Sequence, residues 1–430
     1  MTDTTANGAA GSQPDSGPML AADGTPLKVS LARALRRQKL RALMLIAPLL
    51  LFIVITFLAP IGDMLFRSVE NNIVPETLPR TVVALEQWDP ESGEAPGEAV
   101  FEALQADLLI AAEKKIHTRL GSRLNYETPG ISSLFRKSGR RVDDMEQGPY
   151  KPQFLKIDED WGDVEIWRTI KRYSGAYTAG YFLASVDMEY GADGPQLKPE
   201  DERIYLTLLW RTILLSTVIT VSCILLGYPV AFLLANLPLR TSNVLMILVL
   251  LPFWTSLLVR TSSWIVLLQQ QGVINDTLVT LGLVGDGGRL ELMHNEVGTI
   301  VAMTHILLPF MILPLYSVMK TISPSYVRAA KSLGANDWTA FWRIYFPNTV
   351  PGIGAGAVLV FILAIGYYIT PELVGGTSGI FISNRIAYHI SSSLNWGLAA
   401  ALGVVLLALI LVFYWLYDRI VGVDNVKFGG

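Results

Sequence analysis

The sequence is poor in charge, histidine and cysteine. Lysine, arginine, aspartate and glutamate together make up 17% of its 430 residues, against about 25% in soluble domains. The four histidines are scattered, and none pairs with a carboxylate or with the single cysteine, Cys223, at metal-ligand spacing. One cysteine excludes an intramolecular disulfide, and we expect no metal or other cofactor.

Motifs for nucleotide binding and hydrolytic chemistry are also missing. The chain has no G-x-x-x-x-G-K-[ST], no G-x-G-x-x-G after a strand, no H-E-x-x-H and no G-x-S-x-G. We therefore predict no catalytic residues, no enzyme activity and no nucleic-acid partner. Any energy source must be another subunit or an ion gradient.

Apolar residues are abundant and charge is unevenly spread. Hydrophobic residues make up 51% of the chain. Residues 62–203 hold 26 acidic and 17 basic residues, a net charge of −9, whereas the other 288 residues have a net charge of +6. An acidic segment inside a very apolar remainder is typical of an integral membrane protein.

Six stretches are long and apolar enough to cross about 30 Å of hydrocarbon. The predicted fold is therefore an all-α membrane protein with six transmembrane helices and a mixed, partly helical insertion. Residues 1–41 form a disordered, basic tail in this interpretation, and 62–203 form a small acidic domain. A cleaved signal peptide is the alternative for the first stretch, but its apolar region starts too late and no A-x-A site follows. The predicted spans are 42–61, 206–237, 243–268, 297–319, 352–374 and 397–420, the last five within a core over 204–430.

Basic residues in the short connections predict the orientation. Residues 28–41 carry six bases and no acid, and the 320–351 loop carries four bases against Asp337. The 269–296 loop has the opposite bias, with Arg289 against four acids. An excess of lysine and arginine marks the cytoplasmic side. We expect both termini and the 320–351 loop in the cytoplasm, and the 62–203 segment on the outer side.

Within the 62–203 segment, apolar residues recur at helical spacing in two places. The pattern predicts one amphipathic helix over 98–120 and a shorter one over 160–173. The chain between them is rich in glycine, proline and paired charges, which indicates loops.

Residues 322–351 (ISPSYVRAAKSLGANDWTAFWRIYFPNTVP) read as a helix–turn–helix between two spans. Ser323 and Pro324 are suited to start the first helix, and Gly334 is suited to end it with a positive φ. Asn336 or Asp337 then caps a second helix, which Pro347 is expected to stop. From the residues alone, this segment is either a docking element for another protein or a connector on the lipid headgroups.

The same residues carry a resemblance to a known family. The stretch resembles the E-A-A-x-x-x-G-A-x-x-x-x-x-F-x-x-I-x-L-P signature of permease subunits of binding-protein-dependent ABC importers. The matching positions are Ala329, Ala330, Gly334, Ala335, Phe341, Ile344 and Pro347. Arg328 stands where the family has glutamate, and Phe346 where it has leucine. The resemblance implies that the 322–347 loop docks on a cytoplasmic ATPase and transmits its closure.

Four further blocks, at 227–236, 251–268, 272–283 and 367–376, look like the spermidine/putrescine permease branch. The resemblance covers the chain from about residue 204 onward and the first span. It implies an alternating-access importer for polyamines or related organic cations, in a bacterial inner membrane. The implied partners are ABC ATPase subunits, a second permease in a heterodimer, a periplasmic solute-binding protein and the lipid bilayer.

Several residues in the spans are candidates for the substrate pathway. Arg260 lies in a predicted span, where a charge usually faces a cavity; snorkelling to the interface is the alternative. Glu372 lies beside Tyr367 and Tyr368, and an acid with aromatic faces attracts ammonium groups; a hydrogen-bonded helix end is the alternative. Trp254 follows a proline and is either a pathway residue or an interfacial aromatic.

Two rival functions stay open from the sequence. In the first, the chain belongs to the same family but transports another small solute, such as an opine, an amino-acid derivative or an iron complex. In the second, the chain belongs to a different class of protein, either an ATP-independent secondary transporter or a membrane sensor. Secondary transporters often have two matching halves, and we find no internal repeat.

Overall fold

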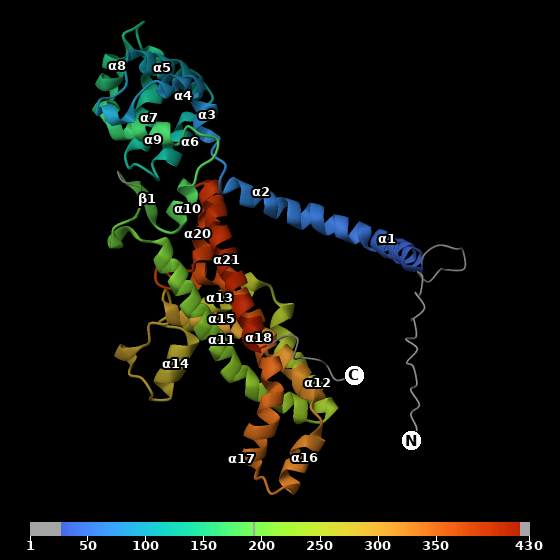
Figure 1. The fold of residues 1–430 in the computed structure, drawn as a ribbon. Coiled ribbons are helices and arrows are strands. Elements are labelled where there is room, and N and C mark those ends of the chain that lie inside the picture. The colour runs from blue at the N-terminus through green and yellow to red at the C-terminus, as the bar shows by residue number, and fades with distance from the viewer. Residues whose placement is uncertain (1–26, 192–193, 422–430) are drawn as a thin grey trace, which may run out of the picture. The chain divides into compact units, whose positions relative to one another are not determined.

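A computed structural model describes residues 27–191 and 194–421 (Figure 1). It divides into two compact units, one before residue 65 and one from Leu65 onward. The predicted disorder of residues 1–26 falls outside the described residues. Residues 27–41, which we also predicted to be disordered, are helical.

A long helix runs through the first unit. It consists of α1 (Leu27–Ile53), a π-helical turn η1 (Val54–Leu58) and α2 (Ala59–Arg67). Its stretch from Gln38 to Arg67 is long and apolar enough to cross a membrane. The helix contains Pro48, which membrane helices tolerate better than soluble ones.

The insertion domain, residues 68–203, folds around its own apolar core. Trp161, Trp167, Phe101, Phe135 and Phe154 are completely buried and touch one another edge to face or tilted. Its elements are α3 (Ile73–Thr77), α4 (Pro79–Glu86), η2 (Pro90–Ser92), α5 (Glu98–Glu113), α6 (His117–Leu124), α7 (Ile131–Arg141), η3 (Val142–Asp144), α8 (Tyr150–Ile157), η4 (Glu159–Gly162), α9 (Val164–Arg172), α10 (Gly180–Ser185), the antiparallel hairpin of β1 (Met188–Gly191) and β2 (Gly194–Leu197), and η5 (Glu200–Glu202).

Three expectations for this domain are wrong in detail. The single helix expected over 98–120 is broken at Lys115, whose φ of 57° ends α5 before α6 begins. The helix expected over 160–173 starts only at Val164, because the Asp163 side chain accepts a hydrogen bond from the Glu165 amide and caps it. The expected loops between them contain α7 and α8, whose apolar sides join the buried core.

The core from residue 204 onward is entirely helical within its described part, and the predicted all-α membrane fold is confirmed. It comprises α11 (Tyr205–Asn236), α12 (Leu239–Leu250), η6 (Leu251–Trp254), α13 (Leu257–Leu268), α14 (Val273–Thr280), η7 (Asp286–Gly288), α15 (Glu296–Thr321), α16 (Pro324–Ser332), α17 (Asp337–Ala340), the π-helical turn η8 (Phe341–Tyr345), α18 (Phe346–Gly366), α19 (Ile369–Val374), α20 (Ile382–Ser391) and α21 (Trp396–Val421).

Helices α11, α15 and α18 pack together around one buried cluster that includes Cys223, Met311 and Val360. Glycines allow the close approach: a Cβ on Gly356 would lie 2.6 Å from the Met311 Sδ, and one on Gly352 would lie 3.0 Å from the Val318 Cβ. Small residues at membrane-helix interfaces let backbones approach in this way.

Two predicted spans differ from the structure. The span expected over 243–268 is broken, and the segments Leu239–Trp254 and Leu257–Thr280 meet at 97°. Pro252 lies in the short turn at the break, and the Ser256 side chain accepts a hydrogen bond from the Val259 amide to start α13. The span expected over 352–374 begins earlier and ends at Gly366, so Glu372 lies on the separate short helix α19.

Candidate functional site

The 322–347 loop begins as its sequence predicts. The Ser323 hydroxyl accepts a hydrogen bond from the Ser325 amide at 3.4 Å, and Pro324 is the first residue of α16. A proline at this position loses nothing, because its missing N–H would have had no partner inside the helix. Figure 1 shows α16 and α17 side by side at the tip of the chain's loop between α15 and α18.

Gly334 forms the turn that ends α16. Its φ is +89°, a region that glycine adopts without a steric penalty. The Gly334 amide donates to the Lys331 carbonyl at 3.0 Å, and the Ala335 amide donates to the Ala330 carbonyl at 3.0 Å. These two bonds make a Schellman motif, which satisfies carbonyls that the helix leaves free.

The second helix starts at the expected residue but does not end where we expected. The Asn336 side chain accepts a hydrogen bond from the Thr339 amide at 2.8 Å and caps α17. The chain then continues through η8 into α18, and Asp337–Gly366 forms one long helix. Pro347 therefore does not stop it. A π-helical turn ends at Tyr345, two residues before the proline, and such a turn adjusts the hydrogen bonding that a proline disrupts.

The loop has an exposed tip and a packed base. Leu333 is 90% exposed and Trp338 is 71% exposed at the tip. At the base, Phe341 and Tyr345 pack edge to face against Phe232 on α11. The remaining signature residues lie between these extremes: Ala329 and Arg328 are exposed, whereas Ala330 and Ala335 are half-buried.

Charge on the loop is almost entirely basic. Lys331 forms an ion pair with Asp337 across the turn, and the Arg328 Nε donates weakly to its own helix, to the Pro324 carbonyl at 3.4 Å. Exposed large apolar side chains of this kind mark a contact with another protein or with the membrane rather than a solvated turn.

Among the pathway candidates, Arg260 and Tyr367 come together. Arg260, on α13, acts electrostatically on both Tyr367 and His305, and its Nε is buried without a hydrogen-bond partner among the described residues. One turn further along α13, the Trp264 Nε1 donates to the His305 Nδ1 at 3.1 Å. A cation and three rings from α13, α15 and the end of α18 thus share one region.

Glu372 and Tyr368 form a second group that contacts the first through threonines. The Asn384 amide donates to the Glu372 Oε2 at 2.6 Å and to the Tyr368 carbonyl at 2.9 Å. Thr370 on α19 and Thr261 on α13 are hydrogen bonded at 3.1 Å, which places α19 against the helix that carries Arg260. Glu372 itself is exposed and keeps one carboxylate oxygen available.

Trp254 does not join either group. It is 86% exposed at the bend between α12 and α13, and no ring contact or hydrogen bond within the described ranges links it to Arg260 or Glu372. Its exposure agrees with the alternative interpretation of an interfacial aromatic residue.

Sequence reasoning missed His305, Trp264 and Asn384. A local signal existed only for Trp264, which lies four residues after Arg260 and so shares its helix face. His305 and Asn384 contact the candidates from other helices, and no spacing in one sequence indicates such a contact.

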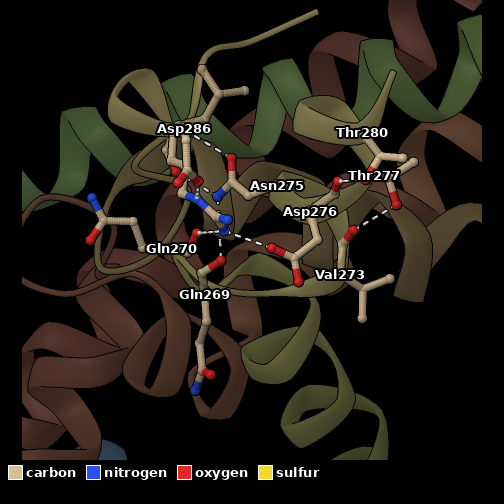
Figure 2. A network of polar contacts seen from close by, with 10 residues as sticks. Gln269, Gln270, Val273, Asn275, Asp276, Thr277, Thr280 and Asp286 are labelled. Carbon is tan, nitrogen blue, oxygen red and sulfur yellow. Dashed lines mark hydrogen bonds and ion pairs between the residues drawn. The ribbon is translucent and has the colours of Figure 1, made fainter. Parts of the chain in front are cut away.

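The 269–295 segment next to this region is held by a polar network (Figure 2). Arg289 donates to Asp276 at 2.7 Å, to Asp286 at 2.9 Å and to the Gln270 carbonyl at 3.1 Å. The buried Asn275 side chain exchanges two hydrogen bonds with the Leu290 backbone. Across residues 27–191 and 194–421, no group of three or more histidine, cysteine or acidic side chains could hold a metal ion.

Comparisons with known proteins show which family this chain resembles. Residues 224–421 match the family described as "Binding-protein-dependent transport system inner membrane component". The spermidine/putrescine transport system permease protein PotB of Haemophilus influenzae is 34% identical over 214 residues, which are 49% of this chain and 74% of that protein. PotB of Escherichia coli is 33% identical over 50% of this chain and 79% of its own length.

Two weaker similarities involve proteins with other names. The inner membrane ABC transporter permease protein YdcU of Escherichia coli is 31% identical over 48% of this chain and 70% of its own length. A solved bacterial ABC transporter involved in alginate import is 21% identical, with a TM-score of 0.42, over 63% of this chain and 99% of the matched one.

Proposed function

The chain belongs to the family of inner membrane components of binding-protein-dependent transport systems, and from that premise we propose that it forms one half of the pathway of a polyamine importer. It is a multi-pass inner membrane permease of an ABC importer and not an enzyme. Putrescine, spermidine or a related organic cation is the substrate in this proposal.

The observation that carries the proposal is the similarity to two PotB permeases over about three quarters of their length. The exposed carboxylate of Glu372 beside the half-exposed Tyr368 supports it, because acids and aromatic faces attract ammonium groups.

The 322–347 loop is the proposed contact with the ATPase. Leu333 and Trp338 offer apolar area at the tip, and the Schellman turn fixes the angle between α16 and α17. Because the base of the loop packs on α11, a displacement of the tip is transmitted to the helices around the pathway. We place both termini and this loop in the cytoplasm, and the insertion domain outside.

The partners in this proposal are two copies of an ABC ATPase, a second permease chain and a periplasmic solute-binding protein. The binding protein delivers the substrate to the outer mouth. ATP binding closes the ATPases on the loops, and hydrolysis returns the pathway to its inward-facing state.

Affinity purification of the tagged chain from its native membrane, followed by mass spectrometry, tests the assembly. We expect an ATPase with a P-loop and a second permease to be recovered with it. The purified complex, reconstituted with the binding protein, should then take up radiolabelled putrescine or spermidine only with ATP. Recovery of the intact chain alone would contradict the assembly, and ATP-driven uptake of neither polyamine would contradict the substrate.

A further inference from the structure

The insertion domain and the start of α21 enclose a cavity of about 510 Å³. Helix α6 contributes Arg119, Ser122 and Arg123, the loop before α21 contributes Asn395, and α21 contributes its first residue, Trp396. Pockets that bind small molecules have volumes of about 300–1,000 Å³. The cavity lies apart from the 322–347 loop and from Arg260 and Glu372, so the transport mechanism above does not use it.

Arg123 is held rigidly at this cavity with part of its donor capacity unused. Its side chain is 5% exposed. Its Nε donates to the Tyr181 hydroxyl at 2.8 Å and its Nη1 to Glu127 at 2.7 Å. The guanidinium lies 4.2 Å from the ring centre of Tyr181 and 4.9 Å from that of Tyr173. Its Nη2 is buried and has no hydrogen-bond partner among the described residues.

Asn395 repeats this pattern from the other side of the cavity. It is 8% exposed, and its Oδ1 accepts a hydrogen bond from the Leu398 amide at 3.2 Å at the start of α21. Its Nδ2 is buried and, within residues 27–191 and 194–421, has no partner. A buried donor left unpaired destabilises the folded state, so two such donors at one cavity point to a ligand with acceptor oxygens.

Charge on the cavity wall restricts the ligand further. Arg67, Arg119 and Arg123 line it together with Glu70 and Glu76, and Glu70 already accepts a hydrogen bond from Asn72. Arginines and carboxylates on one wall favour a ligand that carries both acceptor oxygens and an ammonium group over a purely anionic ligand such as phosphate. A polyamine has ammonium donors and no acceptor, and it would leave the Arg123 and Asn395 donors unpaired.

We propose that this cavity binds a small amino carboxylate, with the carboxylate on Arg123 and Asn395 and the ammonium group toward Glu70 and Glu76. The ligand would join the insertion domain to the permease core, which gives the 62–203 segment a role in sensing a solute. This inference does not depend on polyamine transport, and a failure of either leaves the other standing.

The test uses the full chain, purified in lipid nanodiscs. An equimolar mixture of the twenty L-amino acids, at about 5 mM each, should raise its melting temperature, because a ligand that binds only the folded chain stabilises it. The amino acid responsible is then titrated by calorimetry. Putrescine and succinate, which carry only one of the two group types, should bind at least tenfold more weakly.

Two variants locate the site. Asn395→Asp keeps an oxygen for the Leu398 amide but replaces the free donor with a negative charge, and it should weaken binding at least tenfold. Arg119→Gln, at an exposed position, should weaken it about threefold without affecting the fold. Arg136→Gln removes one charge from the exposed surface of the same domain, away from the cavity, and should bind like wild type.

The proposal would be overturned if the amino-acid mixture left the melting temperature unchanged. Equal affinity in wild type, Asn395→Asp and Arg119→Gln would overturn it as well, as would putrescine competing for the same site. If Asn395→Asp melts at a lower temperature than wild type without ligand, its weaker binding could come from a damaged fold. The affinity of Arg119→Gln then decides whether the cavity is the binding site.

Discussion

At the residue scale, Gly334 is the position where backbone conformation alone should decide function. Its φ is +89°, and a Cβ added there would meet no atom within 4 Å, so a substitution finds open space but a strained backbone. Gly334→Val should disrupt the Schellman turn and reduce ATP-driven putrescine uptake at least tenfold, because β-branched residues resist positive φ. Membrane insertion should be unchanged. Uptake by proteoliposomes and the amount of protein in the membrane are the two measurements.

The matched control for that variant is Gly334→Asn. Asparagine is close to valine in size but enters the left-handed region much more readily, so it should keep most of the activity. Full uptake by Gly334→Val would remove the loop from the coupling mechanism.

Glu372 tests whether the acid near Tyr368 meets the substrate. Gln in place of Glu372 can still accept the hydrogen bond from Asn384 but carries no charge. For a cationic substrate we expect the KM of putrescine uptake to rise at least fivefold, with an unchanged melting temperature. Glu291→Gln, which removes one exposed negative charge from the 269–295 segment, is the control. An unchanged KM in Glu372→Gln would show that this carboxylate only caps local structure.

His389 makes stability depend on pH. It is 3% exposed, and burial, followed by the charge of Arg385, lowers its pKa from 6.5 to about 4. Its ring nitrogens contact the Tyr205 hydroxyl and the Ser393 hydroxyl, and the rings of Tyr126 and Tyr388 pack against it.

A depressed pKa of a base means that the neutral form is favoured in the folded state. The contribution of neutral His389 to the free energy of unfolding is complete above pH 6.5 and falls as the pH drops toward 4. Between about pH 7 and pH 5 the loss should be about 2 kcal/mol from this residue. His389→Gln keeps hydrogen-bonding capacity but cannot titrate. In this variant the melting temperature should change less between these two pH values than it does in the wild type. An equally steep pH dependence in the variant would assign it to other groups.

The sequence was informative about residues whose role is local and uninformative about those that meet across helices. Ser323, Gly334 and Asn336 lie within two to five positions of the backbone groups that they bond or turn, so their roles as caps and turn were predicted correctly. The contacts of Arg260 and Glu372 depend on His305 and Asn384, which only the packing of separate helices brings near.

At the element scale, the contact between α15 and α18 should be sensitive to any side chain at Gly356. A Cβ there would lie 2.6 Å from the Met311 Sδ and 3.2 Å from the Met311 carbonyl oxygen. Gly356→Leu should therefore force the helices apart, at a cost of about 1–3 kcal/mol typical of overpacking. The melting temperature in detergent measures it.

Gly403 on α21 provides the comparison for that variant. A Cβ at Gly403 meets no atom within 4 Å, so Gly403→Leu should melt at or above the wild-type temperature. Equal melting of the two variants would mean that the α15–α18 contact tolerates a wider spacing.

Prolines show why element boundaries were harder to predict than elements. Pro252 was included in a continuous span, yet the chain bends by 97° just after it. Pro347 was expected to end a helix, yet the helix continues into α18. The difference lies in the surroundings: Phe341 and Tyr345 pack on α11 before Pro347, whereas Trp254 beside the bend is 86% exposed.

At the scale of the whole molecule, the distribution of basic residues predicts which loops face the cytoplasm. Lys331 is paired with Asp337 in the 320–351 loop, so Lys320, Arg328 and Arg343 supply its excess positive charge. Paired and unpaired bases count alike in the orientation rule, and the loop keeps its predicted side either way.

Cysteine labelling tests this topology with little background. The single native cysteine, Cys223, is completely buried in α11, so the unmodified chain should stay unlabelled by a membrane-impermeant maleimide. Ser92→Cys, at an exposed site of the insertion domain, should label in intact spheroplasts. Ser332→Cys, at an exposed site of the 322–347 loop, should label only after the membrane is permeabilised. Labelling of Ser332→Cys in intact spheroplasts would show that the predicted orientation is reversed. The 322–347 loop could then not contact a cytoplasmic ATPase, whatever the substrate.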